Sequence, residues 1–98
     1  MNENNAAYII GHVAVKDPQK WAQYQARVPA TLTPWGAELV FRGRRQVVFR
    51  GEHPYTDTVV VRFPNIEALK NWHQSPAYQA LIALRDEAID LVLVGFES

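Results

Sequence analysis

The chain of 98 residues contains no cysteine, which excludes disulfides, thiolate metal sites and a cysteine nucleophile. Neither sign of charge dominates, since ten basic side chains balance ten acidic ones. There is therefore no general attraction to nucleic acid or to an acidic membrane. Apolar runs stay short of the roughly 18 residues of a membrane span, and the first residues lack the pattern of a signal peptide. We expect a cytoplasmic protein that binds neither nucleic acid nor membrane.

The length fits one domain with one hydrophobic core. The first residues are polar, rich in asparagine and without periodicity. We therefore expect residues 1–6 to form a flexible N-terminal tail. Residues 7–98 are predicted to form a single domain whose stability comes from packing.

Extended and helical patterns follow one another along the chain. Asp17 and Pro18 favour the start of a helix, which Pro29 is expected to kink or end. Asn65 caps a second helical stretch, which restarts at Pro76 and continues toward Ile89. Residues rich in β-branched and aromatic side chains predict strands at Ala7–Val15, Ala37–Arg42, Gln46–Arg50, Thr58–Phe63 and Leu91–Phe96.

This order becomes βαββαβ if the two short strands around Gly43–Arg45 count as one hairpin arm. It is the split βαβ pattern of the ferredoxin-like α+β folds, an antiparallel sheet with helices on one face. The strands at Ala7–Val15, Thr58–Phe63 and Leu91–Phe96 carry apolar side chains on both faces, whereas a sheet with one wet face alternates. Because two helices cover only one face, we predict a homodimer that packs sheet against sheet.

Several motifs together resemble the bacterial family catalogued as domain of unknown function 1330, within the dimeric α/β-barrel superfamily of ferredoxin-like folds. They extend from about Tyr8 to Gly95 and include Tyr8-Ile9-Ile10-Gly11-His12, Lys16-Asp17-Pro18, Trp21 with Tyr24, Val28-Pro29-Ala30-Thr31, Gly36, Phe41-Arg42-Gly43, Phe63-Pro64, Ser75-Pro76-Ala77-Tyr78-Gln79 and Arg85. The resemblance implies a dimeric α/β barrel. Superfamily relatives include cofactor-free monooxygenases, lactone isomerases and haem-binding enzymes, which implies a pocket between sheet and helices.

The chain departs from the family pattern at two acidic positions. Arg62 stands where the family usually has a glutamate before Phe63-Pro64, and Arg50 stands where it usually has one before Gly51. A general-base role for those acids therefore does not transfer to this chain.

Two residues are predicted to carry chemistry if the protein is an enzyme. His12 lies in an apolar strand and is interpreted either as a base near the pocket or as a hydrogen-bonded histidine at the dimer interface. Arg85 lies on an apolar helical stripe, where a guanidinium needs a partner. It either pairs with an internal carboxylate such as Asp57 or Glu38, or binds an anionic ligand and stabilises an oxyanion.

Aromatic residues complete the predicted pocket for a small organic or anionic ligand. Tyr24, Trp72 and Tyr78 offer polar groups in an apolar wall, although aromatic residues at helical spacing also suit a core. Arg62 is added because it interrupts an apolar strand. The three histidines lack the spacing of metal ligands, so no metal or cofactor is expected. The predicted function is cofactor-independent monooxygenase-like or isomerase-like chemistry, and the alternative is a non-catalytic ligand-binding or assembly domain.

Overall fold

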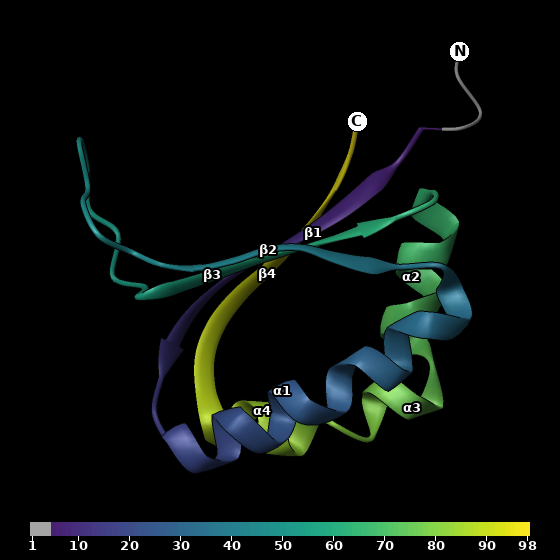
Figure 1. Ribbon diagram of the computed structural model, residues 1–98, viewed down its shortest axis with the longest axis horizontal. Helices are drawn as coiled ribbons and strands as arrows, with labels where there is room; N and C mark the ends of the chain where they lie inside the picture. Colours follow the sequence, from purple (N-terminus) through teal and green to yellow (C-terminus); the bar gives the residue numbers. More distant parts are fainter. Residues whose placement is uncertain (1–4) are drawn as a thin grey trace.

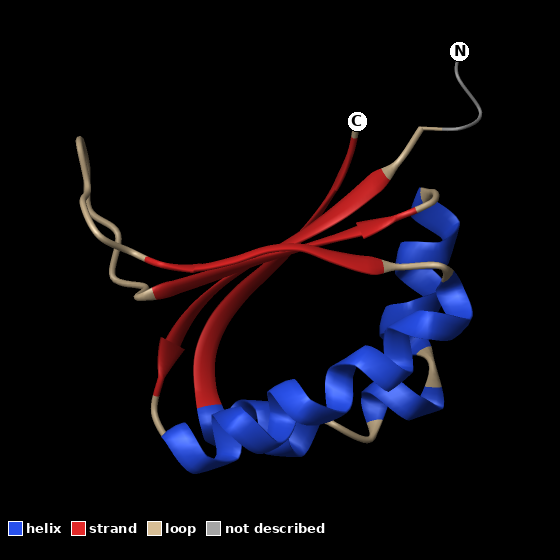
Figure 2. Ribbon diagram, viewed as in Figure 1, coloured by secondary structure: helices blue, strands red, loops and turns tan. Residues whose placement is uncertain are grey.

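The computed structural model describes residues 5–98, so the predicted tail of residues 1–6 falls largely outside the described residues. The elements follow the chain as β1 (Ala7–Val15), α1 (Pro18–Leu32), the 3-10 turn η1 (Thr33–Trp35), β2 (Glu38–Arg44), β3 (Asp57–Phe63), α2 (Ile66–Gln74), α3 (Pro76–Gln79), α4 (Ile82–Ala88) and β4 (Ile89–Glu97). The strands form one antiparallel sheet in the order β2-β3-β1-β4. Figures 1 and 2 show the helices gathered on one side of this sheet. The predicted ferredoxin-like arrangement is confirmed.

Side-chain caps determine where the helices begin. The Asp17 carboxylate accepts two hydrogen bonds of 3.1 Å from backbone N–H groups in the first turn of α1, which Pro18 opens. Asn65 Oδ1 accepts a hydrogen bond of 2.8 Å from the backbone N–H of Ala68 at the start of α2. Since each cap closely follows a strand, it turns the chain back across the sheet.

Pro29 was predicted either to kink the first helix or to end it, and the helix does not end there. α1 continues to Leu32, and η1 extends the chain to Gly36. Pro29 lacks a donor N–H, but its carbonyl still accepts a hydrogen bond of 3.2 Å from the Thr33 hydroxyl. Gly36 ends the turn with a φ of 68°, in the left-handed region that glycine adopts without strain.

The strand predicted at Gln46–Arg50 is wrong. β2 runs through Gly43 as far as Arg44, which pairs with Asp57 of β3. Residues 45–56, which we call the arm, then project beyond the end of the sheet (Figure 1). The valines of this segment favour an extended chain, but among the described residues no neighbouring strand pairs with it.

The continuous helix predicted from Ala77 toward Ile89 is also wrong. The structure divides it into α3 and α4, with Ala80 and Leu81 between them. Their ψ angles of −17° and −8° are closer to zero than the ψ of about −42° in an α-helix, so the helical turn is irregular at this point.

The two faces of the sheet differ in what covers them. On the helix-covered face, strand and helix side chains form the core: Ala7, Ile9, Val61, Phe63, Leu69, Trp72, Tyr78 and Leu81. On the other side, which we call the open face, large apolar side chains remain exposed: Phe41, Val92, Val94 and Phe96. The strands are therefore apolar on both faces, as predicted, and the helices cover only one of them.

Candidate functional site

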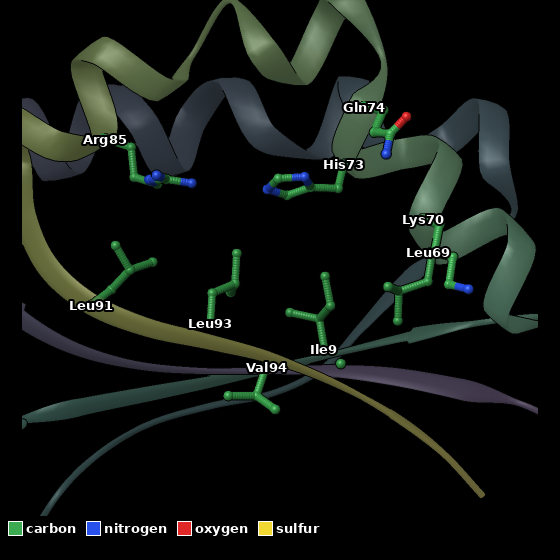
Figure 3. A pocket seen from close by; sticks show the side chains of 10 residues that line it. Ile9, Leu69, Lys70, His73, Gln74, Arg85, Leu91, Leu93 and Val94 are labelled. Atoms are coloured by element: carbon green, nitrogen blue, oxygen red, sulfur yellow. The ribbon is translucent and has the colours of Figure 1, made fainter.

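A cleft of about 430 Å³ opens between β4 and the helices α2 and α4. We call it the β4 cleft. Its floor is apolar and includes Ile9, Leu91 and Leu93, while Lys70, His73, Gln74 and Arg85 lie among its polar lining. Figure 3 shows His73 and Arg85 extending toward one another above the floor, whereas Val94 points to the other side of the sheet.

Arg85 places a positive charge in the β4 cleft, which Lys70 also lines. The Arg85 side chain is only 14% exposed. Nη1 donates a hydrogen bond of 3.2 Å to the Tyr78 hydroxyl, and Nε donates one of 3.0 Å to Asp86 Oδ1. Burial alone lowers the pKa of Arg85, but the interactions with Tyr78 and Asp86 outweigh burial and raise it. The guanidinium is therefore charged, and within residues 5–98 its Nη2 has no hydrogen-bond partner.

The prediction that Arg85 pairs with an internal carboxylate such as Asp57 or Glu38 is wrong. Asp57 accepts a hydrogen bond from the neighbouring Thr56 hydroxyl, and Glu38 lies 3.9 Å from Arg62 on the open face. Asp86 is the carboxylate partner of Arg85 instead, because the arginine side chain bends toward the residue that follows it in the same helix. Helix spacing rules consider residues three and four apart and give no weight to such a neighbour.

The buried Trp72 and Tyr78 and the half-buried Tyr24 form an aromatic wall beside the β4 cleft. The hydroxyls of Tyr24 and Tyr78 share a hydrogen bond of 2.7 Å, and the Trp72 indole N–H donates one of 3.0 Å to the Thr31 hydroxyl. Burial, reinforced by the charge and hydrogen bond of Tyr78, raises the pKa of Tyr24. These polar groups therefore have hydrogen-bond partners within the chain. The Tyr78 hydroxyl also accepts the hydrogen bond from Arg85, so the aromatic wall helps to hold the guanidinium in place.

A smaller apolar cleft of about 80 Å³ lies on the α1 side of the same wall. Tyr24, Trp72 and Tyr78 line it together with apolar residues of α1 and β3. It shares Ile9 and Leu93 with the β4 cleft, so the same two strand residues contribute to both hollows.

The structure divides the predicted site residues between the two faces of the sheet. Four lie on the helix-covered side: Tyr24, Trp72, Tyr78 and Arg85. His12 and Arg62 lie on the open face, because they alternate with the buried Ile9 and Val61 along their strands. His12 Nδ1 is 3.0 Å from Thr58 Oγ1 within a hydrogen bond. Within one chain, the predicted pocket that joins His12 to Arg85 is therefore not formed.

Two residues of the β4 cleft were missed by the sequence interpretation. His73 was considered only as one of three histidines that lack the spacing of metal ligands, and Lys70 was not considered. Their spacing of three residues along α2 places both side chains over β4. That spacing was a usable signal, but its meaning depends on knowing which strand lies beneath the helix.

Other kinds of site find little support in residues 5–98. This part of the chain holds no cluster of three or more histidine, cysteine or acidic side chains that could bind a metal ion. His12 and His53 instead contact each other edge to face, with ring centroids 4.9 Å apart. Among the described helices, none combines the length and apolar character needed to cross a membrane. The cytoplasmic location stays a prediction.

Fold and site together define a ferredoxin-like α+β protein with a positively charged cleft between its sheet and helices. More specifically, the chain belongs to the family described as Domain of unknown function (DUF1330), whose model matches residues 6–97. The resemblance drawn from the sequence motifs is therefore confirmed. No curated protein matches the chain.

Similar solved structures extend this result at the level of fold. A protein of unknown function from Rhodopseudomonas palustris, RPA0582, has a TM-score of 0.84 at 14% identity, covering 98% of this chain and 84% of that one. SnoaB, a cofactor-independent oxygenase from Streptomyces nogalater, has a TM-score of 0.71 at 9% identity, with coverages of 96% and 93%. A dimeric ferredoxin-like protein of unknown function from Jannaschia sp. has a TM-score of 0.75 at 12% identity, with coverages of 95% and 99%.

Proposed function

We propose that the β4 cleft binds a small organic anion or carbonyl compound. The observation that carries this proposal is the charged guanidinium of Arg85, whose side chain is only 14% exposed and which faces His73 above an apolar floor. The floor suits a carbon skeleton, and Nη2 of Arg85 offers a charge-assisted hydrogen bond to an oxygen. Lys70 adds a second cation, and the described residues that line the cleft include no aspartate or glutamate.

Cofactor-independent chemistry of the monooxygenase or isomerase type fits this arrangement. His73 would accept a proton from the carbon next to a carbonyl group, and Arg85 would stabilise the enolate oxygen that results. In an unsaturated carbonyl compound, return of the proton to a different carbon gives isomerisation. In the other route the enolate carbon bonds to dioxygen and the peroxide takes up the proton; loss of water from this hydroperoxide breaks the O–O bond and leaves one oxygen atom on that carbon as a new carbonyl group. The likeness to SnoaB supports the second route by fold alone. In this proposal His73 takes the role of base that the sequence interpretation gave to His12.

A homodimer through the open faces completes the proposal. Apolar side chains of β2 and β4 are exposed there, among them Phe41, Val94 and Phe96, and a second sheet is the complementary surface that would remove them from water. The dimeric protein from Jannaschia sp. supports this assembly. His12, whose imidazole is paired with Thr58, is then an interface residue.

Binding of benzoate, compared with uncharged benzamide, tests the cleft. We expect Arg85→Gln to raise the dissociation constant of benzoate by roughly 10- to 100-fold, because a charge-assisted hydrogen bond is worth about 1.5–3 kcal/mol. Arg27→Gln is the matched control, since Arg27 is exposed on α1. The constants come from NMR titration or calorimetry on samples with native-like circular dichroism. Equal affinities of the Arg85→Gln and Arg27→Gln variants for benzoate would contradict the proposal. Benzamide that binds as tightly as benzoate would show that the cleft recognises the carbonyl group rather than the negative charge.

A non-catalytic binding or assembly domain is the second candidate, and the internally satisfied aromatic wall favours it. Tyr24, Trp72 and Tyr78 all have protein partners, so they serve stability without a ligand. Native mass spectrometry of protein taken directly from its producing cells separates the candidates. A bound small molecule that Arg85→Gln loses supports a working cleft, whereas an unliganded protein that Arg85→Gln only destabilises supports the structural role.

A further inference from the structure

The arm, residues 45–56, is a projecting segment with a fixed base. At that base, the backbone N–H of Arg45 donates a hydrogen bond of 2.7 Å to the carbonyl of Thr56. The Arg45 guanidinium also donates to the carbonyls of His53 and Tyr55. Figures 1 and 2 show the arm extending past the end of the sheet and bending away from the helices, toward the side of the open face.

The arm carries a run of three apolar residues that nothing within residues 5–98 covers. Phe49 is 92% exposed, and Val47 and Val48 are exposed beside it. Single exposed apolar residues are common, but a run of three on a projecting segment forms a patch of the kind that marks an interaction site. Nothing in the described chain packs over the Phe49 ring.

Phe41 makes the arm continuous with the open face. A Cβ atom on Gly43 would clash with Cζ of Phe41, so the absence of a side chain at Gly43 leaves room for this ring at the base of the arm. Phe41, Val47 and Val48 line a cleft of about 440 Å³ between the arm and the sheet. A surface that covers the open face would therefore meet the arm as well.

We propose that the arm clasps a second copy of this chain and buries Phe49 against it. This inference rests on the proposed dimer through the open faces. The second copy is the occupant because the arm lies on the same side of the sheet as the open face and shares Phe41 with it. Two-fold symmetry then places two arms in each dimer, so every change in the arm acts twice.

Sedimentation across a dilution series tests the clasp. We expect Phe49→Ser to raise the dissociation constant of the dimer by about 100-fold or more, because two buried phenylalanine side chains are lost from each dimer. Phe49→Leu keeps most of the apolar surface and should have a smaller effect. Glu52→Ser changes an exposed residue of the same arm and should leave the constant within about 3-fold of the wild-type value.

Val94→Lys separates failure of the clasp from failure of the dimer itself. Val94 lies on the open face away from the arm, so Val94→Lys should dissociate a sheet-to-sheet dimer. If Val94→Lys dissociates the dimer while Phe49→Ser leaves it unchanged, the clasp is overturned and the proposed dimer stands. If Val94→Lys leaves the dimer intact, the open faces do not form the interface and both proposals fail.

A fluorescent label reports the surroundings of position 49 directly. The chain has no cysteine, so Phe49→Cys can be labelled with acrylodan at this position alone. The clasp predicts blue-shifted emission in the dimer and a red shift on dilution to the monomer.

A membrane contact is the alternative occupant of the arm. Arg45 and Arg50, which flank the apolar run Val47–Phe49 in the sequence, also suit an acidic lipid surface. Wild-type binding to phosphatidylserine vesicles that Phe49→Ser abolishes, with no change in dimer dissociation, would overturn the clasp in favour of a membrane contact.

Discussion

The two faces of the sheet use the same strands for different purposes. On the helix-covered face, buried polar groups have partners inside the chain, as in the chain of hydrogen bonds from Tyr24 through Tyr78 to Arg85. On the open face, Val94 and Phe96 are exposed although they belong to the same β4 that lines the cleft. The helix-covered face therefore contributes to the core and to the charged β4 cleft, whereas the open face carries an apolar surface suited to association.

The largest expected effect compares one phenylalanine from each face. Phe63 is 0% exposed in the core, and Phe96 is 49% exposed on the open face. Phe63→Ala should lower the free energy of unfolding by about 3–5 kcal/mol, since it leaves a cavity. Phe96→Ala should cost the monomer only about 1 kcal/mol, because half of the ring is already in water.

Urea unfolding in a Val94→Lys background measures this difference without the contribution of dimerisation, which otherwise adds to apparent stability. The same Phe96→Ala change in the wild-type background should cost more, because there it also removes proposed interface surface. Equal costs for Phe63→Ala and Phe96→Ala in the monomeric background would contradict the contrast between the faces.

A pH-dependent effect should be confined to the helix-covered face. The pKa of Tyr24 is raised, mainly by burial. Above about pH 10 the unfolded chain loses this proton while the native protein keeps it, so the contribution is present below pH 10 and is lost as the pH rises further. Stability should fall by at most about 1.4 kcal/mol per pH unit through this group.

Tyr24→Phe should make the alkaline loss of stability less steep and should cost about 1 kcal/mol at neutral pH through the lost hydrogen bond. The free energy of unfolding between pH 8 and 11 checks both effects. Tyr55→Phe, in the arm, is the matched control and should keep the wild-type slope. A Tyr24→Phe profile parallel to that of the wild type would rule out Tyr24 as the source.

The elements that could be predicted from the sequence are those fixed by local chemistry. Asp17 and Asn65 begin helices because their side chains satisfy free backbone N–H groups. The open face could also be predicted, since apolar residues on both sides of a strand need two covers. The arm could not, because Val47 and Val48 favour an extended chain whether or not a partner strand lies beside them.

The candidate site could be predicted only in part, because the sequence does not show which elements lie against one another. Tyr78 and Arg85 share a helical stripe in the sequence, and the hydrogen bond between them joins this pair. The side of His12 was ambiguous because Ile9 and Ile10 are both apolar, so alternation shows that they lie on opposite faces but not which face the helices cover. His73 gained its meaning only when α2 was placed over β4.

The smallest expected effect concerns the arginine of the open face. Arg62 lies directly across from Glu38 on the neighbouring strand, with a separation of 3.9 Å and 42% of its side chain exposed. Exposed pairs of this kind contribute about 0–1 kcal/mol. Arg62→Gln should therefore change the unfolding free energy of the monomeric background by about 0.5 kcal/mol or less, and benzoate binding not at all, in contrast to Arg85→Gln.

Exchanging the two charges tests whether the arginine at position 62 acts only through this cross-strand pair. Arg62→Glu alone places two carboxylates opposite each other and should destabilise the monomeric background by about 0.2–1 kcal/mol. The double variant Glu38→Arg with Arg62→Glu restores an opposite-charge pair in the reverse order and should recover that loss. If the double variant recovers stability in the monomeric background but changes dimer dissociation when Val94 is kept, Arg62 contributes to association. If it recovers neither, Arg62 has a role on the open face beyond its pairing with Glu38.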